Sequence, residues 1–476
     1  MRFGLILAIN ARMLICCGLL MMIPALMDFV QHHGMANAFT LSSGLTISVG
    51  LLLYFLTPKE QDSLYPKEMF LTTTLMWLLY ALFAAIPFFL PPHPVSFTNA
   101  FFESVSGLTT TGATIFSNID NLSEGTLFWR SMTQWFGGIG IIVVALVVLP
   151  TLRIGGMQLF ATESVILSER ISPTVRKSVR DILLYFMFLT LCCGACLWWA
   201  GMTPFDSVNH AMTTIATGGF STHDASIAYF HSSTIEWIVL GFMFLAGLPL
   251  VIGPHLFHKQ FASIKSNVQI LTFIKIILIA VVILGFAYGW HNIRTILFQI
   301  ISIMTTTGFV VSDYSMWGGV AIALFMILLV SGACTGSTSG GIKMFRFAVI
   351  GRVLIQRMKS LVQPHAVFVA RYGEKVIDTE IVDSVLFFFG MFCITAIVSV
   401  LALSALGLDY ITALSGTLTC VANVGPALGS VIGPIQNFDN LPDAAKWILS
   451  VDMLLGRLEF TSIVVLFLPF LWRRTV

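Results

Sequence analysis

The 476-residue sequence is poor in charge. Asp, Glu, Lys and Arg make up 10% of it, while hydrophobic residues make up 57%. Soluble domains use about 25% charged residues, so this chain cannot cover a water-facing surface in the usual way. Its net charge is only +2, and a protein that binds duplex nucleic acid needs clustered cations well beyond this. The sequence therefore predicts a protein embedded in a lipid bilayer and argues against nucleic acid as its ligand.

The sequence also lacks the patterns that indicate a disulfide framework, a metal site or an active site. Its eight cysteines are scattered at Cys16, Cys17, Cys192, Cys193, Cys196, Cys334, Cys393 and Cys420. Nearly all fall in apolar runs, where a small buried side chain is the usual role of a free cysteine. There is no His-rich or paired-carboxylate motif, which a polytopic membrane enzyme would need. We therefore expect no catalysis and no organic cofactor in this chain.

Apolar runs near the length of about 20 residues that spans a bilayer recur along the chain. Ten are expected to span, near residues 5–28, 37–56, 69–90, 126–150, 181–201, 235–257, 268–290, 315–358, 382–406 and 443–472. No small-x-small cleavage site follows the first run, so we expect a retained helix and not a signal peptide. Ten spans place both termini on one side of the membrane.

The loops on the two sides differ in charge. Most of the Lys and Arg lie in the loops 57–68, 151–180, 258–267 and 342–381. These loops and both termini are therefore expected to be cytoplasmic. The opposite loops carry few cations and a set of carboxylates, at Asp120, Glu124, Asp206, Asp224, Glu236, Asp313, Asp409, Asp439 and Asp443. An acidic vestibule favours cation entry, but ordinary hydrophilic loop residues explain each carboxylate equally well.

A short glycine segment occurs four times among the last eight spans. The copies are GLTTTGA (107–113), TIATGGF (214–220), IMTTTGF (303–309) and CVANVGP (420–426). Each follows an apolar or amphipathic stretch that is too short to span. The expected fold class is an all-α polytopic membrane protein with four helix, pore-loop, helix repeats around a pseudo-fourfold pore, preceded by two extra N-terminal helices. The boundaries are 1–66 for this extension and 67–160, 161–264, 265–361 and 362–476 for the repeats.

Irregular backbone at membrane depth leaves carbonyl groups unsatisfied. It is tolerated only where protein buries it or where it lines a water-filled cavity. Four copies that converge on one axis would direct rings of carbonyl oxygens inward, and such rings replace the hydration shell of a monovalent cation. Glycine suits the position because the loop needs unusual backbone angles and close backbone approach. One copy would be an ordinary turn, but four copies in register favour a pore.

Three further stretches accompany these loops: RSMTQWFGGIGIIVVALVVLP (130–150), SGACTGSTSGGIKMFR (331–346) and MLLGRLEF (453–460). Together the four loops resemble the selectivity filter of the Trk/Ktr/HKT superfamily of potassium transporters, and the whole chain resembles its TrkH-type uptake subunit. The resemblance implies the potassium ion as the bound and transported species. It assigns the filter to Thr110, Thr111, Gly112, Thr217, Gly218, Gly219, Thr306, Thr307, Gly308, Asn423, Val424 and Gly425.

Two details of this filter stay open. In the second loop, pairing its GF with the GF of the third loop selects Gly219, but Gly218 is the alternative. The fourth loop departs from the pattern, since Asn423 and Val424 replace threonines and Pro426 follows the glycine. A filter of backbone carbonyls tolerates that change, whereas a filter of four threonine hydroxyls does not.

A second glycine-rich segment, SGACTGSTSGGIK, interrupts the expected span 315–358. It has low helix propensity, and a helix-packing face of small residues is the alternative interpretation. The resemblance implies an intramembrane gating loop at this place. The expected gate residues are Gly332, Thr335, Gly336, Ser337, Thr338, Ser339, Gly340, Gly341, Lys343 and Arg457.

Arg457 lies near the middle of the last expected span. A charge at that depth costs at least about 2.5 to 3.5 kcal/mol unless it faces water or a partner. Glu459 is two residues further on and points elsewhere on a helix. A cation that faces the cavity below the filter is the favoured interpretation, and a structural pair with a buried carboxylate is the alternative.

The resemblance further implies a homodimer with one pore per protomer in the bacterial inner membrane. It also implies a cytoplasmic nucleotide-binding regulatory subunit of TrkA type, for which the basic loops 151–180 and 342–381 are the natural contact surface. A sodium- or proton-coupled potassium symporter is the alternative function. It would normally show inverted repeats and a buried carboxylate in mid-span, and neither is evident in the sequence.

Overall fold

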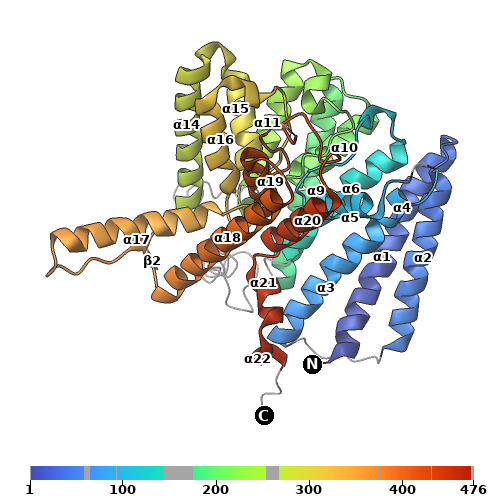
Figure 1. Ribbon diagram of the computed structural model, residues 1–476, viewed down its shortest axis with the longest axis horizontal. Coiled ribbons are helices and arrows are strands. Elements are labelled where there is room, and N and C mark those ends of the chain that lie inside the picture. Colours follow the sequence, from blue (N-terminus) through green and yellow to red (C-terminus); the bar gives the residue numbers. More distant parts are fainter. Residues whose placement is uncertain are drawn as a thin grey trace.

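The computed structural model describes residues 2–57, 65–92, 94–143, 175–253, 267–373, 375–429 and 431–472. In this part of the chain the protein is an α-helical bundle with one small hairpin of β1 (Arg371–Tyr372) and β2 (Lys375–Val376). The start of α1 (Phe3–Val30) and the last helix, α22 (Pro469–Trp472), lie at the same end of the bundle (Figure 1).

The first two helices form an antiparallel pair at one edge of the bundle (Figure 1). α1 packs closely along α2 (Ala36–Leu56), because Gly18 and Gly50 leave no side chain at the contact. The Ser43 hydroxyl donates a hydrogen bond to the Gly18 carbonyl at 2.6 Å across this interface. The pair is attached to the first repeat, where α1 packs against its two outer helices. This is the predicted N-terminal extension.

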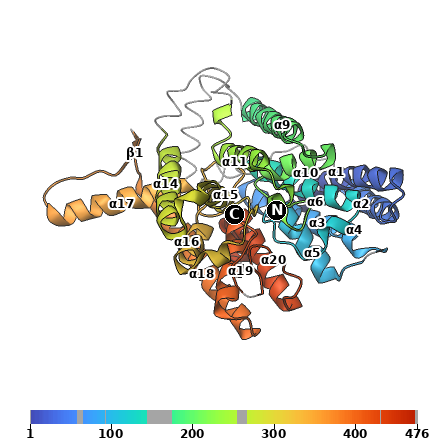
Figure 2. The same ribbon diagram turned by 90° about the horizontal axis from the view of Figure 1, so that it is seen from above.

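Each of the four repeats contains two outer helices and one short helix between them. The outer pairs are α3 (Pro66–Ala84) with α6 (Glu124–Val143), α9 (Val175–Trp199) with α11 (Ser233–Gly247), α14 (Val268–Tyr288) with α16 (Gly319–Val330), and α18 (Thr379–Ala405) with α20 (Asp443–Arg457). The short helices are α5 (Phe97–Leu108), α10 (Pro204–Ile215), α15 (Ile293–Met304) and α19 (Tyr410–Ala422). Figure 2 shows the repeats arranged around a common centre. The predicted fold class is confirmed.

Apart from α17 (Met344–Val362), the remaining described elements are short connections. They are α4 (Ile86–Phe89), η1 (Ile119–Asn121), η3 (Ser226–Phe230), η4 (Trp290–Asn292), η5 (Tyr314–Trp317), α21 (Thr461–Val464) and η6 (Val465–Phe467). The predicted boundaries between the first and second repeats and between the second and third lie outside the described residues.

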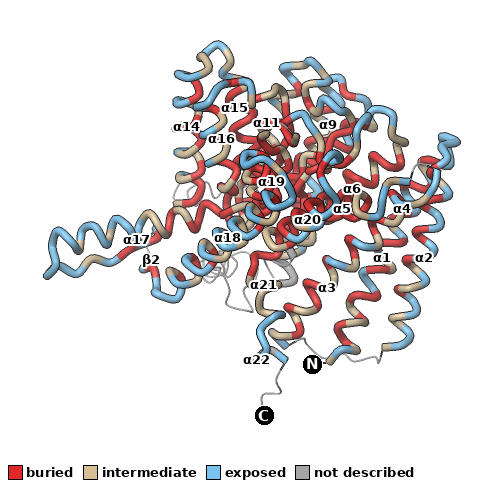
Figure 3. The backbone as a smooth tube through the Cα atoms, viewed as in Figure 1, coloured by how far each residue is buried: buried red, intermediate tan, exposed pale blue. Residues whose placement is uncertain are grey.

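The C-terminal halves of the four short helices lie at the centre of the bundle, where Figure 3 shows mostly buried residues. Every residue from Ala100 to Leu108 is buried, so α5 has protein on all of its faces. Three of these helices begin at a side-chain cap, provided by Ser96, Thr203 and Asp409. Each ends at one of the glycine segments. The C-terminal end of a helix carries a partial negative charge, so these four ends favour a cation at the centre.

Two large apolar clusters pack around these helices. One joins the second and third repeats and contains Phe273, Phe298 and Phe325. The other joins the extension to the first and fourth repeats and contains Phe102 and Trp129. The glycine segments therefore lie between these two apolar clusters.

The expected spans are only partly confirmed. Six described helices are long and apolar enough to cross a bilayer, namely α1, α2, α3 with α4, α9, α14 and α18. The other expected spans correspond to α6, α11, α16 and α20, whose described parts are shorter or more polar.

The predicted span 315–358 is wrong in its second half. α16 ends at Val330, and the next helix, α17 (Met344–Val362), projects sideways from the bundle instead of crossing it (Figure 1). Arg352, Arg357 and Lys359 explain this direction, because α17 would have to place three cations in hydrocarbon if it continued the span.

The last span, 443–472, is also not continuous. α20 ends at Arg457, and the backbone then turns at Glu459 and Phe460, which have φ angles of 57° and 46°. Arg457 is therefore the last residue of a helix and not the middle of one.

Candidate functional site

The four glycine segments have the same backbone conformation. In each, a non-glycine residue just after the short helix is left-handed, with φ of 52° at Thr110, 52° at Thr217, 56° at Thr306 and 56° at Asn423. Two residues later a glycine has positive φ, which is 83° at Gly112, 78° at Gly219, 82° at Gly308 and 102° at Gly425. The departure of the fourth loop in sequence therefore does not change its fold. The same register identifies Gly219, and not Gly218, as the counterpart of the other three glycines.

The four loops contact one another in a closed ring. A β-carbon on Gly112 would overlap the carbonyl oxygen of Gly218 in the second loop. The same relation holds for each following pair, which are Gly219 with the Thr307 carbonyl, Gly308 with the Val424 carbonyl, and Gly425 with the Thr111 carbonyl. Each loop thus places its glycine against the backbone of the next, and the fourth returns to the first. Since a side chain cannot fit at these contacts, glycine is required at all four positions.

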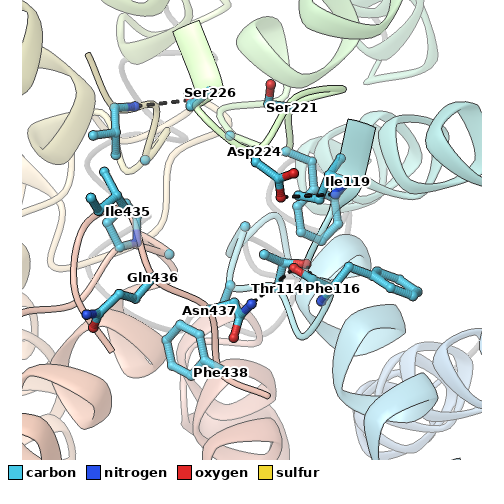
Figure 4. Close-up of a pocket in the computed structure, with 18 of the residues that line it drawn as sticks. Thr114, Phe116, Ile119, Ser221, Asp224, Ser226, Ile435, Gln436, Asn437 and Phe438 are labelled. Carbon is cyan, nitrogen blue, oxygen red and sulfur yellow. Dashed lines mark hydrogen bonds between the residues drawn. The ribbon is translucent and has the colours of Figure 1, made fainter. Parts of the chain in front are cut away.

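The ring forms the floor of an open cavity of about 630 Å³. All four of these glycines line it, together with loop residues that include Thr114, Asp224, Asn437 and Phe438 (Figure 4). The Asp224 carboxylate accepts a hydrogen bond from the Ile119 backbone at 3.0 Å. The cavity is therefore a vestibule that leads to the four loops.

A buried ion pair connects the first two loops. Arg130 Nε lies 2.8 Å from Glu103 Oε1, and both side chains are almost fully buried. The Glu103 carboxylate also accepts hydrogen bonds from Thr114 Oγ1 and the Ile115 backbone in the first loop. Arg130 Nη1 donates to the Ser221 carbonyl after the second loop at 3.1 Å. Neither Glu103 nor Arg130 is among the site residues predicted from the sequence.

Polar side chains brace the other loops as well. Gln134 of α6 donates to the Gly218 carbonyl at 2.6 Å and accepts from the Phe220 backbone at 3.1 Å. Ser302 donates to the Phe309 carbonyl at 2.7 Å, within the third loop. Asn423 donates to Thr111 Oγ1 at 3.0 Å, so the fourth loop is tied to the first. Gln134 and Ser302 were also missed, although a polar residue in a buried apolar run is itself a signal.

The segment 331–343 lies directly against the helix ends beneath the ring. Thr338 Oγ1 donates to the Ile215 carbonyl at 3.0 Å and lies 3.2 Å from Thr217 Oγ1. The Gly340 backbone donates to Thr306 Oγ1 at 2.7 Å. A β-carbon on Gly340 would overlap the Ala422 carbonyl. This segment therefore contacts the second, third and fourth loops from one side.

Backbone hydrogen bonds hold the segment in this position. Gly332 donates to the Ile342 carbonyl at 2.9 Å, which closes the base of the loop. Leu250 donates to the Gly336 carbonyl and Thr335 to Gln269 Oε1, each at 2.9 Å. The Lys343 ammonium hydrogen-bonds to Ser339 within the segment. The segment is thus an ordered loop and not a helix-packing face.

Arg457 binds this loop through its guanidinium. Nη1 donates to the Thr338 carbonyl at 2.9 Å, and Nη2 lies 3.4 Å from the Gly137 carbonyl. Among the described residues no carboxylate lies within salt-bridge distance of Arg457. Glu459 instead pairs with Arg346 of α17 at 2.5 Å. The alternative of an Arg457 ion pair is therefore not supported by the geometry.

Most of the outer carboxylates have structural partners. Glu236 pairs with Arg294 at 2.7 Å, Asp313 and Asp409 cap helices, and Asp439 lies 3.9 Å from Lys446. Of the nine carboxylates, Asp224 lines the vestibule. The interpretation as ordinary loop residues therefore explains most of this set.

His223 connects two of the remaining carboxylates at the rim of the vestibule. Its Nδ1 contacts Asp120, its Nε2 lies 3.5 Å from Asp206, and its ring stacks on Tyr229. Burial alone would lower the pKa of His223, but the nearby Asp206 carboxylate and the hydrogen bond to Asp120 outweigh burial and raise that pKa above the usual 6.5. Asp120 is also partly desolvated, yet its contact with His223 lowers its pKa below the usual 3.8.

The expectation that a buried mid-span carboxylate is lacking is wrong. Asp452 of α20 is only 2% exposed, and Glu103 is also buried. The sequence does not mark Asp452 as buried, because the same stretch also contains Asp443, Lys446 and Arg457 and is not purely apolar.

Known proteins are similar to this chain in architecture and in sequence. The family TrkH, described as a cation transport protein, matches residues 35–289 and 267–474. The Trk system potassium uptake protein TrkI of Halomonas elongata is 40% identical over 480 residues, which cover 99% of this chain and 98% of the relative. The Trk system potassium uptake protein TrkH of Escherichia coli is 37% identical over 467 residues, which cover 95% of this chain and 96% of that relative. The crystal structure of the potassium transporter TrkH from Vibrio parahaemolyticus matches with a TM-score of 0.89 and 32% identity, over 99% of this chain and 100% of that one.

Proposed function

Because the chain belongs to the TrkH family of cation transport proteins, we propose that it takes up potassium ions through a selective, gated pore, with one pore in each protomer. Its relatives are named potassium uptake proteins. The residues Thr110 to Gly112, Thr217 to Gly219, Thr306 to Gly308 and Asn423 to Gly425 form the selectivity filter. Uptake needs no catalysis, and potassium is the only ligand that this function requires of the chain.

The observation that carries the proposal is the closed ring of four loops. Every loop has the same backbone, although only two of them share the same three residues before the glycine. A filter made of backbone carbonyls needs this shared conformation and does not need identical side chains. Uncharged oxygens suit conduction because they bind an ion yet allow it to leave. The C-terminal ends of the four short helices add a favourable field at the same place.

The loop 331–343 is the proposed gate. It contacts the helix ends on the inner side of the ring and is held by Arg457. An ordered loop at this depth blocks the path of an ion that leaves the filter. The cation Arg457 adds a repulsive potential below the filter. Displacement of the loop therefore opens the pore without a change in the ring.

The cytoplasmic surface is the proposed site of assembly. α17 has an apolar face of exposed side chains at Leu354, Ile355, Met358, Leu361 and Val362, which follow helical spacing. In Figure 1 this helix extends beyond the bundle and the chain after it returns alongside, where Gln356 Nε2 donates to the Phe368 carbonyl at 2.7 Å. We assign its apolar face to a second copy of the chain in a homodimer. The exposed basic residues Arg352, Arg357, Lys359 and Arg371 face a nucleotide-binding regulatory subunit, while the basic loop 151–174 lies outside the described residues.

Bi-ionic recording tests selectivity and conduction together. The purified protein is placed in a planar bilayer with potassium on one side and sodium on the other, with and without the regulatory subunit and nucleotide. We expect a reversal potential that favours potassium. A reversal potential near zero with measurable current would contradict the filter assignment.

A second experiment separates a channel from a coupled symporter. Rubidium-86 uptake is measured in proteoliposomes that have no sodium or proton gradient. A channel takes up rubidium under these conditions down its own gradient. If uptake appears only when a sodium or proton gradient is imposed, the protein is a symporter.

A further inference from the structure

A groove runs between α18 and α20 on the outside of the fourth repeat, away from the ring. Its volume is about 540 Å³, which is in the range of small-ligand sites. Its walls are aliphatic, with Ile394 and Val398 on α18 and Val451 and Leu455 on α20. Ile394, Val398 and Val451 are more than half exposed. In a bilayer this groove therefore opens to lipid and not to water.

One carboxyl group lies in this apolar groove. Asp452 is only 2% exposed and lines the groove. Its Oδ1 accepts a hydrogen bond from Ser399 Oγ at 2.8 Å. Its Oδ2 is buried and has no hydrogen-bond partner in the described part of the chain. No Lys, Arg or His of the described residues lies within salt-bridge distance of it.

The groove begins close to the membrane surface. Trp447 lines its outer end and stacks on Phe101 at 4.9 Å between ring centroids. Tryptophan is enriched at the boundary between hydrocarbon and water. Asp452 is five residues further along α20, or about 7.5 Å along the helix axis. An amphiphile that enters from the outer leaflet can therefore place its polar end at Asp452 with only a short displacement.

We propose that this groove binds a lipophilic amine from the outer leaflet, with the ammonium group on Asp452 Oδ2 and the alkyl chain along Val398 and Val451. An ammonium supplies both things that Oδ2 lacks, a hydrogen-bond donor and a positive charge. Charge-assisted hydrogen bonds of this kind are the strong ones, and the apolar walls bury the chain. A metal ion does not fit, because among the described residues no cluster of three His, Cys, Asp or Glu could hold one.

Labelling with a hydrophobic carbodiimide tests this site. Dicyclohexylcarbodiimide adds to a protonated carboxyl group and rearranges to a stable N-acylurea, with no leaving group. The full chain in phosphatidylcholine vesicles is treated with this reagent, with or without dodecylamine, and the peptide that contains Asp452 is measured by mass spectrometry. We expect labelling at Asp452 that dodecylamine reduces at least tenfold. The matched neutral amphiphile, dodecanol, should leave labelling within twofold of its starting value.

A binding measurement complements the labelling. Dodecylamine should raise the midpoint of thermal unfolding of the vesicle-bound protein, because a ligand that binds only the native state stabilises it. Asp452→Asn keeps the size of the side chain and removes its charge, so it should lose most of this shift. Equal protection by dodecanol, or an equal shift in Asp452→Asn, would overturn the proposal. Failure of dodecylamine to protect Asp452, including the case in which a second copy of the chain covers the groove, would overturn it too.

Discussion

At the level of single residues, Gly112 combines two requirements, a positive φ angle and contact with the next loop. Gly112→Ser should lower the permeability ratio of potassium to sodium, because the new side chain overlaps the Gly218 carbonyl and displaces one contact of the ring. A loss of about 1 kcal/mol in discrimination corresponds to about a fivefold change. Bi-ionic reversal potentials measure this ratio.

Gly407→Ser is the matched control for that substitution. Gly407 also has a positive φ of 90°, but no atom lies within 4 Å of a β-carbon there. The Gly407→Ser variant therefore shows the effect of backbone strain at a position outside the ring. If both variants keep the wild-type permeability ratio, Gly112 is not a filter residue.

Arg457 is expected to restrain conduction. Arg457→Ala removes the donor to the Thr338 carbonyl and the charge below the filter, so potassium flux should rise several-fold while the preference for potassium persists. Arg457→Lys should give an intermediate flux, since it keeps the charge and loses the planar guanidinium. Flux is measured per correctly assembled protein, with assembly checked by size-exclusion chromatography. Lost assembly in both variants, with no gain of flux, would indicate a purely structural role.

His223 gives the vestibule a pH-dependent stability. Its pKa in the folded protein is raised above 6.5 by Asp206 and Asp120, so protonation stabilises the fold. This contribution is fully present below pH 6.5 and is lost as the pH rises through the raised pKa. The wild-type midpoint of thermal unfolding should therefore fall over that window relative to His223→Gln.

The groups that face His223 define the control for this experiment. They are Asp120 on η1, Asp206 on α10, and the neighbouring rings of Tyr229 and Phe230. Asp120→Asn removes one of the two carboxylates and should reduce the pH dependence while it retains the histidine. If both His223→Gln and Asp120→Asn keep the wild-type pH dependence of the unfolding midpoint, this cluster does not determine that dependence.

At the level of elements, the loop between α16 and α17 can be removed without removing the ring. Deletion of Thr335 to Ser339 should raise flux and weaken its control by the regulatory subunit, because these residues contact the helix ends but contribute none of the four glycines. The potassium preference should remain. The smaller change Thr338→Ala, which removes the bond to the Ile215 carbonyl, should raise flux to a lesser extent. A folded, dimeric deletion variant that does not conduct would contradict the gate assignment.

The elements that the sequence predicted are those with a repeated or periodic signal. The four glycine segments were found because one pattern occurs four times in register, and the short helices follow from the apolar stretches before them. The direction of α17 was missed because hydrophobic periodicity does not tell where a helix lies after an irregular loop. The turn at Glu459 and Phe460 was missed for a related reason, since neither residue type usually favours a positive φ.

The supporting side chains were harder to predict than the loops. Arg130, Gln134 and Asp452 each occur once, and their partners lie far away in the chain. Only the fold brings such partners together. The sequence nevertheless shows that each of these polar residues lies in an expected membrane span. A polar group at that depth needs a partner, so its presence there predicts one.

At the level of the whole molecule, the apolar face of α17 should control oligomeric state. Leu361→Glu places a charge on a side chain that is 82% exposed in the single chain, so the single chain should tolerate it while a dimer that buries this face should dissociate. Val367→Glu, at a residue that is 91% exposed and beyond α17, is the matched control. Molar mass from light scattering distinguishes monomer from dimer in each variant. A Leu361→Glu protein that remains dimeric would show that α17 is not the interface.

The closed ring has a consequence for biosynthesis. A ribosome delivers the loops in the same order in which they contact one another, and the last contact joins Gly425 to the Thr111 carbonyl. A nascent or truncated chain that stops before the fourth repeat therefore has an incomplete ring. Such a fragment should not conduct potassium selectively, so cells are spared a selective leak while the protein is being made.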